Sequence, residues 1–250
     1  MKFITLFFFL LISLDNSSAK SILIDPGHGG EDCGAKGKYW VKKTLKIVCE
    51  KDIALSIAKE AHKLISKNHN AYLTRSVDRT LTLEQRAALA DKIKADIFIS
   101  IHINGSTSRS SRGFETFYLD NHDDAAVKKV EEVENKNSQG EQVIINKILA
   151  DLVIDRTAPS SRKLSGKIHN RLSKVLPKKY GMIDRGVKPA LFYVMALSKR
   201  PAILLEVGFI SNQKELKIMS TKKFQKEYAK AIAQGVEDYF GKVKKRPPLL

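Results

Sequence analysis

The sequence predicts a single α/β domain in which a mostly parallel, twisted sheet is flanked by helices. Two observations support this fold class: short apolar runs recur along most of the chain, and amphipathic segments with helical spacing separate several of them. The composition agrees, because 43% of the 250 residues are hydrophobic and 28% are charged, which is typical of a globular domain. The length suits one domain of this class.

The predicted strands are short runs rich in Ile, Leu, Val and Phe between turn residues, and the predicted helices have apolar residues three or four positions apart. One helix begins at a capping box formed by Thr82 and Gln85. The expected elements, in order, are a strand at 21–25, a glycine-rich loop at 27–37, a helix at 50–67, a strand at 71–74, a helix at 82–94, strands at 96–101 and 114–119, one or two inserted helices within 120–180, strands at 190–195 and 201–207, and a closing helix near 224–239.

Residues 1–19 have the pattern of a secretory signal peptide rather than of a folded element. Lys2 supplies a positive start, an apolar stretch follows, and Ser17 and Ala19 place small residues before a cleavage site. The apolar stretch is short for a membrane span, so an uncleaved anchor is the less favoured alternative. We therefore expect export, with the periplasm as the favoured destination and the cell wall or the medium as the alternatives. The catalytic domain is then expected at 20–240.

The chain carries 44 Lys and Arg against 27 Asp and Glu, which gives a net charge of +17. In an exported protein this excess favours anionic envelope polymers or membrane surfaces as partners, not nucleic acid. A basic surface that is merely solvated is the alternative. The basic tail at 241–250 contains two prolines and no acidic residue, so we expect it to be disordered. No apolar run reaches the ~18 residues of a stable membrane span. We also expect the protein to be a monomer.

Three of the predicted strands end in residues able to bind a metal or move a proton. His28 follows the first strand, His102 ends another, and Glu206 lies near the end of a third, while Glu50 begins the first long helix. Ligands of open α/β sheets bind beyond the carboxyl ends of the strands. Two histidines and a carboxylate form a standard catalytic zinc set. Their spacing forms no local motif, so a hydrogen-bonded loop or core role is the alternative for each histidine.

Glu206 is the sharper indication of chemistry, because the surrounding segment 202–210 is otherwise wholly apolar. An ionised carboxylate is costly in such surroundings unless it is paired or used. Partial burial would raise its pKa and suit it to general-base work. A structural salt bridge with an arginine is the alternative.

Seven short segments follow one another in order between about Ser21 and Phe240. They are Ile24–Gly30 (IDPGHGG), Cys49–Asp52 (CEKD), Thr74–Arg75 (TR), Ser100–Asn104 (SIHIN), Gly113–Thr116 (GFET), Arg185–Lys188 (RGVK) and Leu205–Asn212 (LEVGFISN). Together they resemble the zinc-dependent N-acetylmuramoyl-L-alanine amidases of the amidase-3 type. The resemblance implies that His28, Glu50 and His102 bind one Zn²⁺ and that Glu206 is the catalytic acid/base.

The resemblance also implies a substrate and a reaction. The substrate would be peptidoglycan, and the bond would be the amide between the lactyl group of N-acetylmuramic acid and L-alanine of the stem peptide. Such an enzyme would act in cell-wall remodelling or in the separation of daughter cells. A zinc peptidase that cuts within the stem peptide and a non-catalytic envelope-binding protein are the alternatives. Asn104 could orient the substrate or could hold a turn.

The insertion at 120–180 resembles that of division-associated amidases, whose inserted helix covers the zinc. Its acidic first part contains Glu131, Glu132, Glu134 and Glu141. One of these carboxylates could occupy the open zinc position and displace the water. A protein activator acting on the insertion would then be expected. A solvated surface helix without a regulatory role is the alternative.

Cys33 and Cys49 are the only cysteines of the chain. Two cysteines of an exported protein can pair, and a shared metal at His28 and Glu50 would bring these two together. We therefore expect a disulfide. Two reduced, buried thiols are the alternative.

Overall fold

The computed structural model describes residues 18–136 and 141–241, with side chains from residue 148 onward in the second range. Residues 1–17 of the expected signal peptide and 242–250 of the expected tail lie outside the described residues. Among the described helices, none combines the length and the apolar character needed to cross a membrane.

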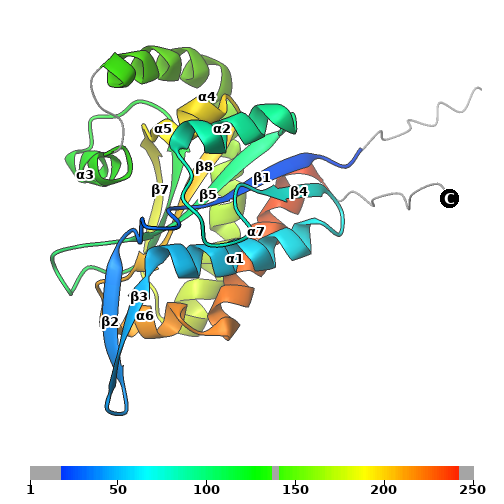
Figure 1. The fold of residues 1–250 in the computed structure, drawn as a ribbon. Helices are drawn as coiled ribbons and strands as arrows, with labels where there is room; N and C mark the ends of the chain where they lie inside the picture. Colours follow the sequence, from blue (N-terminus) through cyan, green and yellow to red (C-terminus); the bar gives the residue numbers. More distant parts are fainter. Residues whose placement is uncertain (1–17, 137–140, 242–250) are drawn as a thin grey trace, which may run out of the picture.

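Within the described residues, the centre of the molecule is a six-stranded sheet of order β4-β1-β5-β8-β6-β7 (Figure 1). The first four strands in this order are parallel to one another, β6 runs antiparallel to β8, and β7 runs parallel to β6. This arrangement confirms the predicted α/β class with a mostly parallel sheet. The bounds are β1 Ser21–Pro26, β4 Asn70–Leu73, β5 Ile97–Asn104, β6 Phe114–Leu119, β7 Asp184–Ala190 and β8 Ala202–Phe209.

Helices cover both faces of the sheet, which is why every residue of β5 and β8 is buried. One face packs against α1 (Glu50–Ile65), α7 (Lys222–Phe240) and the second half of α4 (Glu141–Tyr180). The other face packs against α2 (Leu83–Lys92), α5 (Tyr193–Ser198) and the described side chains in the first half of α4. The strands therefore read as continuous apolar runs, and their few polar residues stand out.

The insertion consists of two helices, as expected: α3 (Ala125–Glu134) and the long α4. The predicted capping box of α2 is also present, since the Thr82 side chain accepts from Gln85 N and the Gln85 side chain accepts from Thr82 N. This reciprocal pair satisfies two donors at the helix start and fixes where α2 begins.

Three elements differ from the sequence prediction. The strand expected at 190–195 is wrong, because β7 ends at Ala190 and α5 begins at Tyr193. The run ALFYVMAL is apolar throughout, and a short buried helix and a buried strand share that pattern. The short helix α6 (Gln213–Met219) was not expected. The hairpin of β2 (Lys36–Val41) and β3 (Thr44–Cys49) was also not expected, and it overlaps the end of the predicted loop.

Candidate active site

His28, Glu50, His102 and Glu134 converge at the carboxyl ends of the parallel strands. Each offers one ligand atom, and these atoms all lie within 4.8 Å of one another. His28 lies in the loop after β1, Glu50 is the first residue of α1, His102 lies in β5, and Glu134 is the last residue of α3. Four elements that are distant in sequence thus supply one cluster, as the topology of an open α/β sheet allows.

Glycines allow the chain to pass close to this cluster. A Cβ on Gly27 would lie 2.4 Å from a ring carbon of His102, and a Cβ on Gly34 would lie 2.5 Å from a carboxylate oxygen of Glu50. Gly34 also has a φ of +67°, which glycine adopts without strain. The two positions therefore require glycine if the loop is to bring His28 to the other ligands.

Two buried arginines hold the loop that carries His28. Arg75 donates to the carbonyl oxygens of Pro26 and Gly27, and Arg86 donates to those of Pro26 and His28. Arg86 also pairs with the buried carboxylate of Asp25 at 2.7 Å. Burial would raise the pKa of Asp25, but Arg86 and the Thr74 hydroxyl outweigh it and lower that pKa. A charge network beneath the site thus fixes the backbone around His28.

The side chains of the cluster are oriented by further hydrogen bonds. His28 Nδ1 lies 2.8 Å from Asp32 Oδ2, which leaves Nε2 directed at the cluster. The two carboxylate oxygens of Glu50 accept from Ala35 N and Ile103 N, each at 2.8 Å. Such outer contacts set the position and the basicity of metal ligands.

The residues present fit a zinc ion. His28 Nε2 and His102 Nδ1 are buried without a hydrogen bond to any described residue, although each lies 2.9–3.6 Å from oxygens of Glu50 and Glu134. Burial would lower the pKa of His102, but Glu134 and Glu50 raise that pKa to about 10. Nitrogen donors facing carboxylates in this way suit a divalent cation, and two histidines with a carboxylate are typical of zinc.

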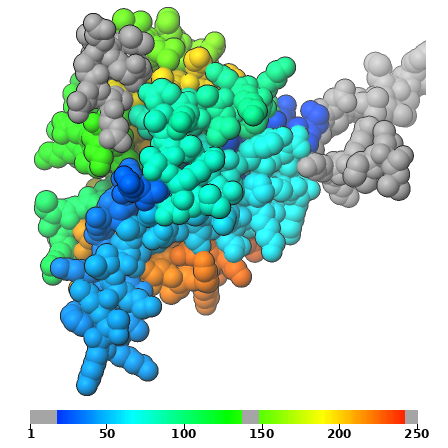
Figure 2. Space-filling view, in the orientation of Figure 1, coloured from blue at the N-terminus to red at the C-terminus, as the bar shows by residue number. Residues whose placement is uncertain are grey.

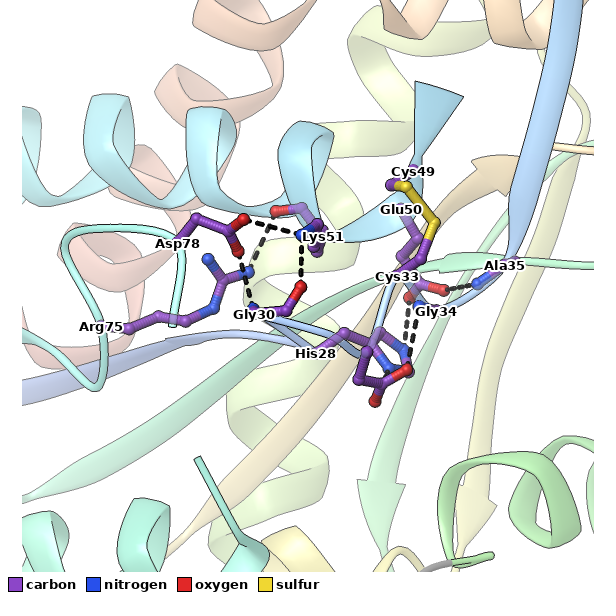
Figure 3. The surroundings of a disulfide bond; sticks show 11 residues. His28, Gly30, Cys33, Gly34, Ala35, Cys49, Glu50, Lys51, Arg75 and Asp78 are labelled. Atoms are coloured by element: carbon purple, nitrogen blue, oxygen red, sulfur yellow. Dashed lines mark hydrogen bonds and ion pairs between the residues drawn. A yellow bond between two sulfur atoms is a disulfide. The ribbon is translucent and has the colours of Figure 1, made fainter. Parts of the chain in front are cut away.

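Cys33 and Cys49 form a disulfide beside the ligands (Figure 3). Cys49 immediately precedes Glu50, and Cys33 immediately precedes Gly34, whose backbone N donates to Asp32. The bond ties the loop after β1 to the start of α1, so the segments that supply His28 and Glu50 are covalently linked.

Replacing both cysteines with serine should lower the free energy of unfolding by about 3 kcal/mol, because the unfolded chain regains the conformational entropy that the bond removes by closing a loop with a sequence separation of 16. Denaturant unfolding of the variant and of the wild type, each with and without reductant, measures this. Reductant should destabilise the wild type to the level of the variant and leave the variant unchanged. Two titratable thiols in the unreduced, unfolded wild type would contradict the bond.

Glu206 lies in the strand next to His102, directly opposite it in the register, and Glu115 of β6 lies opposite Glu206 on the other side. Residues opposite one another share a face of the sheet, so His102, Glu206 and Glu115 form a row. Glu206 is 1% exposed, and its Oε2 has no hydrogen bond to any described residue. Burial, followed by the charges of Glu134 and Glu50, raises its pKa well above the ordinary value. Across residues 18–136 and 148–241, Glu206 forms no arginine salt bridge.

Asn104 ends β5 in the same region, and its side-chain amide donates to Glu115 at 2.9 Å. Glu115 also accepts from Lys188 at 2.6 Å and from Arg185 at 3.3 Å. The sequence analysis missed Glu115 as a site residue, although it stands in the quoted GFET segment. Glu115 is the one charged residue of its strand, and that was the signal that could have found it.

Glu134 is the residue of the acidic stretch that the structure brings into the cluster, with Oε2 2.9 Å from His102 Nδ1 and 3.6 Å from His28 Nε2. Glu131 instead bonds to His122 at 2.6 Å and to the backbone N of Leu191. Glu132 is exposed. The side chain of Glu141 lies outside the described residues.

The end of α3 is fastened to the segment between β7 and α5. The Asn135 side chain accepts from Tyr193 N at 2.9 Å and donates to Leu191 O at 2.8 Å. Glu131 bonds to the same segment, so contacts on both sides of Glu134 hold it over the cluster. A cavity of about 270 Å³ opens beside it, lined by His28, His102 and Glu134 among others.

The family model described as N-acetylmuramoyl-L-alanine amidase, Amidase_3, matches residues 22–238. The chain belongs to this family. It is 33% identical over 230 residues to the N-acetylmuramoyl-L-alanine amidase AmiA of Escherichia coli K12, covering 88% of this chain and 75% of AmiA. It is also 34% identical over 229 residues to AmiC of Escherichia coli O6:H1. This match covers 88% of this chain but only about half (52%) of AmiC.

Among solved structures, the CwlD amidase of Clostridioides difficile in complex with the GerS lipoprotein matches this amidase domain with a TM-score of 0.64 at 28% identity. The match covers 88% of this chain and 98% of CwlD. The family assignment confirms the resemblance drawn from the seven segments, and the shared fold accounts for the order of the strands around the cluster.

Proposed function

We propose that this chain is a peptidoglycan hydrolase that cleaves the amide between N-acetylmuramic acid and L-alanine of the stem peptide. The observation that carries the proposal is the convergence of His28, Glu50 and His102 beside the buried Glu206. Three metal donors with a nearby carboxyl group of raised pKa are the parts that metal-assisted amide hydrolysis needs. Membership of the amidase family supplies the substrate class.

His28, Glu50 and His102 would hold the ion through His28 Nε2, a carboxylate oxygen of Glu50 and His102 Nδ1. A bound zinc supplies a water of lowered pKa and polarises the scissile carbonyl. The bonds from Ala35 N and Ile103 N fix the Glu50 carboxylate, and Asp32 fixes the His28 ring, so this chain presents its donors already oriented.

Glu206 is the proton carrier of the reaction. Its carboxylate takes a proton from the attacking water and delivers it to the nitrogen of the leaving L-alanine amine. Burial in apolar surroundings and the neighbouring carboxylates raise its pKa. The raised pKa makes the carboxylate a stronger base, and it keeps the acid form protonated until the proton passes to the leaving amine. Asn104 lies beside Glu206, where its side chain either orients the substrate or fixes the Glu115 carboxylate through its hydrogen bond.

The regulatory part of the proposal concerns Glu134. With its Oε2 2.9 Å from His102 Nδ1, this carboxylate occupies the position that water and substrate need, and α3 then acts as an autoinhibitory helix. Access to the cluster requires α3 to move and its bonds to Leu191 and Tyr193 to break. A protein activator that binds the insertion would supply the energy for this displacement.

The apolar surface of α4 is a suitable place for such an activator. Ile148 and Leu152 are 61% and 67% exposed and lie four residues apart on one side of the helix. Exposed apolar side chains gathered in this way mark interaction surfaces. The related CwlD amidase was solved with a lipoprotein partner. Export by the leader at 1–19, with the periplasm as destination, would place this chain beside both its substrate and such a partner.

Mass spectrometry of digested peptidoglycan tests the reaction. An amidase releases stem peptides that begin with a free L-alanine amine and leaves the lactyl groups on the glycan. Shortened peptides still attached to the glycan would instead indicate a zinc peptidase. Neither product, from folded and zinc-loaded protein with the insertion displaced or deleted, would indicate a non-catalytic envelope-binding protein.

Replacing His102 with alanine should remove most of the bound zinc, because the ion loses one of three protein ligands. The fold should be kept, because the His102 side chain lines the cavity. Metal analysis of the dialysed variant and the wild type measures this, and added zinc should restore activity to the chelated wild type. The matched control is His62→Ala, a histidine on α1 outside the cluster, which should keep its zinc. Full zinc occupancy in His102→Ala would remove His102 from the ligand set.

A further inference from the structure

The β2–β3 hairpin projects from the body of the molecule as an arm beside α6 (Figures 1 and 2). Its large apolar side chains are exposed: Trp40 by 60%, Ile47 by 70%, Leu45 by 41% and Val41 by 40%. Among the described residues, six other large apolar side chains are exposed, but none of them forms so dense a group in sequence. Contiguous exposed apolar residues indicate an interaction surface.

The register of the hairpin places three of these side chains together. Trp40 lies opposite Leu45, and Ile47 lies two residues further along β3, opposite Lys38. Residues that are opposite, or two apart on one strand, share a face, so Lys38, Trp40, Leu45 and Ile47 form one apolar face with a lysine at its edge.

The hairpin is also strongly basic. Residues 36–48 contain five lysines and no acidic residue, and two of the lysines form the turn at the tip: Lys36, Lys38, Lys42, Lys43 and Lys46. An apolar face rimmed by lysines complements a surface that is apolar inside and anionic outside. The headgroup region of an anionic lipid bilayer has this character, and tryptophan is enriched there.

We propose that the β2–β3 hairpin binds an anionic membrane surface, with Trp40, Leu45 and Ile47 in the interfacial layer and the lysines on the lipid phosphates. A hydrated anionic polymer could pair with the lysines but would leave the aliphatic side chains in water, so the composition of the face favours lipid. The disulfide at Cys49 and the adjoining Glu50 connect the base of the hairpin to the metal ligands. Membrane binding would therefore orient the active site relative to the bilayer.

Trp40 is the only tryptophan of the chain, so its fluorescence reports on the hairpin alone. Protein purified from the exported fraction would be titrated with vesicles of phosphatidylglycerol and phosphatidylethanolamine, and separately with phosphatidylcholine vesicles. We expect a blue shift with the anionic vesicles and quenching by lipids brominated on the acyl chain. Higher salt should weaken the binding, since it screens the lysines.

Matched variants separate the apolar and the basic contributions. Lys42→Ser, Lys43→Ser and Lys46→Ser together should weaken vesicle binding on the order of a hundredfold, at roughly fivefold per lysine. Ile47→Ser should weaken it roughly fivefold. Val77→Ser, which removes a side chain 58% exposed outside the hairpin, should leave binding unchanged. Hydrolysis of soluble muramyl-peptide fragments should be the same in all three proteins.

Three outcomes would overturn the proposal. The first is an unshifted and unquenched Trp40 signal with anionic vesicles. The second is a Trp40 shift with purified sacculi but without quenching by brominated lipids, which would assign the hairpin to the wall polymer instead. Equal vesicle binding by Ile47→Ser and Val77→Ser would remove the apolar face from the contact.

Discussion

Replacing Glu206 with glutamine is expected to lower turnover by about 10²–10⁴-fold, while the fold and the zinc content remain those of the wild type. Glutamine has nearly the same shape as glutamate but cannot accept the proton of the attacking water. Glu206 Oε2 has no hydrogen bond to any described residue, so the substitution breaks no ion pair there. The loss should therefore appear in kcat and not in stability.

The pH profile adds a readout that a structural role would not change. Burial and neighbouring carboxylates raise the pKa of Glu206, and the base form is the active one. Activity of the wild type should then rise with pH through this pKa, and the residual activity of Glu206→Gln should lack that rise. Glu132→Gln, an exposed carboxamide substitution on α3, is the control. Near-normal turnover of Glu206→Gln would exclude Glu206 as the general base.

The sequence was sufficient to predict most strands of the sheet and the polar residues at the strand ends. His102 and Glu206 interrupt apolar runs, and such an interruption near the end of a buried strand has few explanations besides function. Glu50 was a candidate because it begins the first long helix, and the resemblance to the amidase family implied its place among the zinc ligands. The candidates came from local pattern and the general topology of open α/β sheets, and their roles came from the family resemblance.

Contacts that depend on several distant segments could not be predicted in the same way. Arg86 supports the His28 loop only because α2 packs over β1, and its partner Asp25 is 61 residues away. The hairpin escaped prediction because its two strands are stabilised mainly by each other and leave apolar residues in solvent. Neither the pairing partner nor the exposure of a residue can be read from a single short window.

The choice among the acidic residues of the insertion depended on the start of α3. Asp124 caps the helix by accepting from Ala126 N and Val127 N, and this sets the helical phase of the residues that follow. Glu131 and Glu134 are three apart and lie on one side, while Glu132 faces solvent. The sequence supplied the candidates, but only the packing of α3 against residues 191–193 determines which of them reaches the histidines.

Replacing Glu134 with alanine is expected to raise basal hydrolysis by about 10–100-fold, because its carboxylate no longer lies at the cluster to favour the closed state, and couplings of this kind are worth about 1–3 kcal/mol. Zinc content should stay at that of the wild type, since His28, Glu50 and His102 remain. Asn135→Ala should activate in the same direction but less, because it removes two bonds that hold α3 closed and leaves the carboxylate in place.

The control for this prediction is Glu132→Ala, which removes an exposed carboxylate from the same helix and should leave the basal rate unchanged. The charge of Glu134 helps to raise the pKa of Glu206, so its removal should also move the acid limb of the pH profile to lower pH. Loss of zinc from Glu134→Ala would make Glu134 a required ligand rather than an inhibitor. A basal rate equal to that of the wild type, in folded and zinc-loaded protein, would show that this carboxylate does not restrain the enzyme.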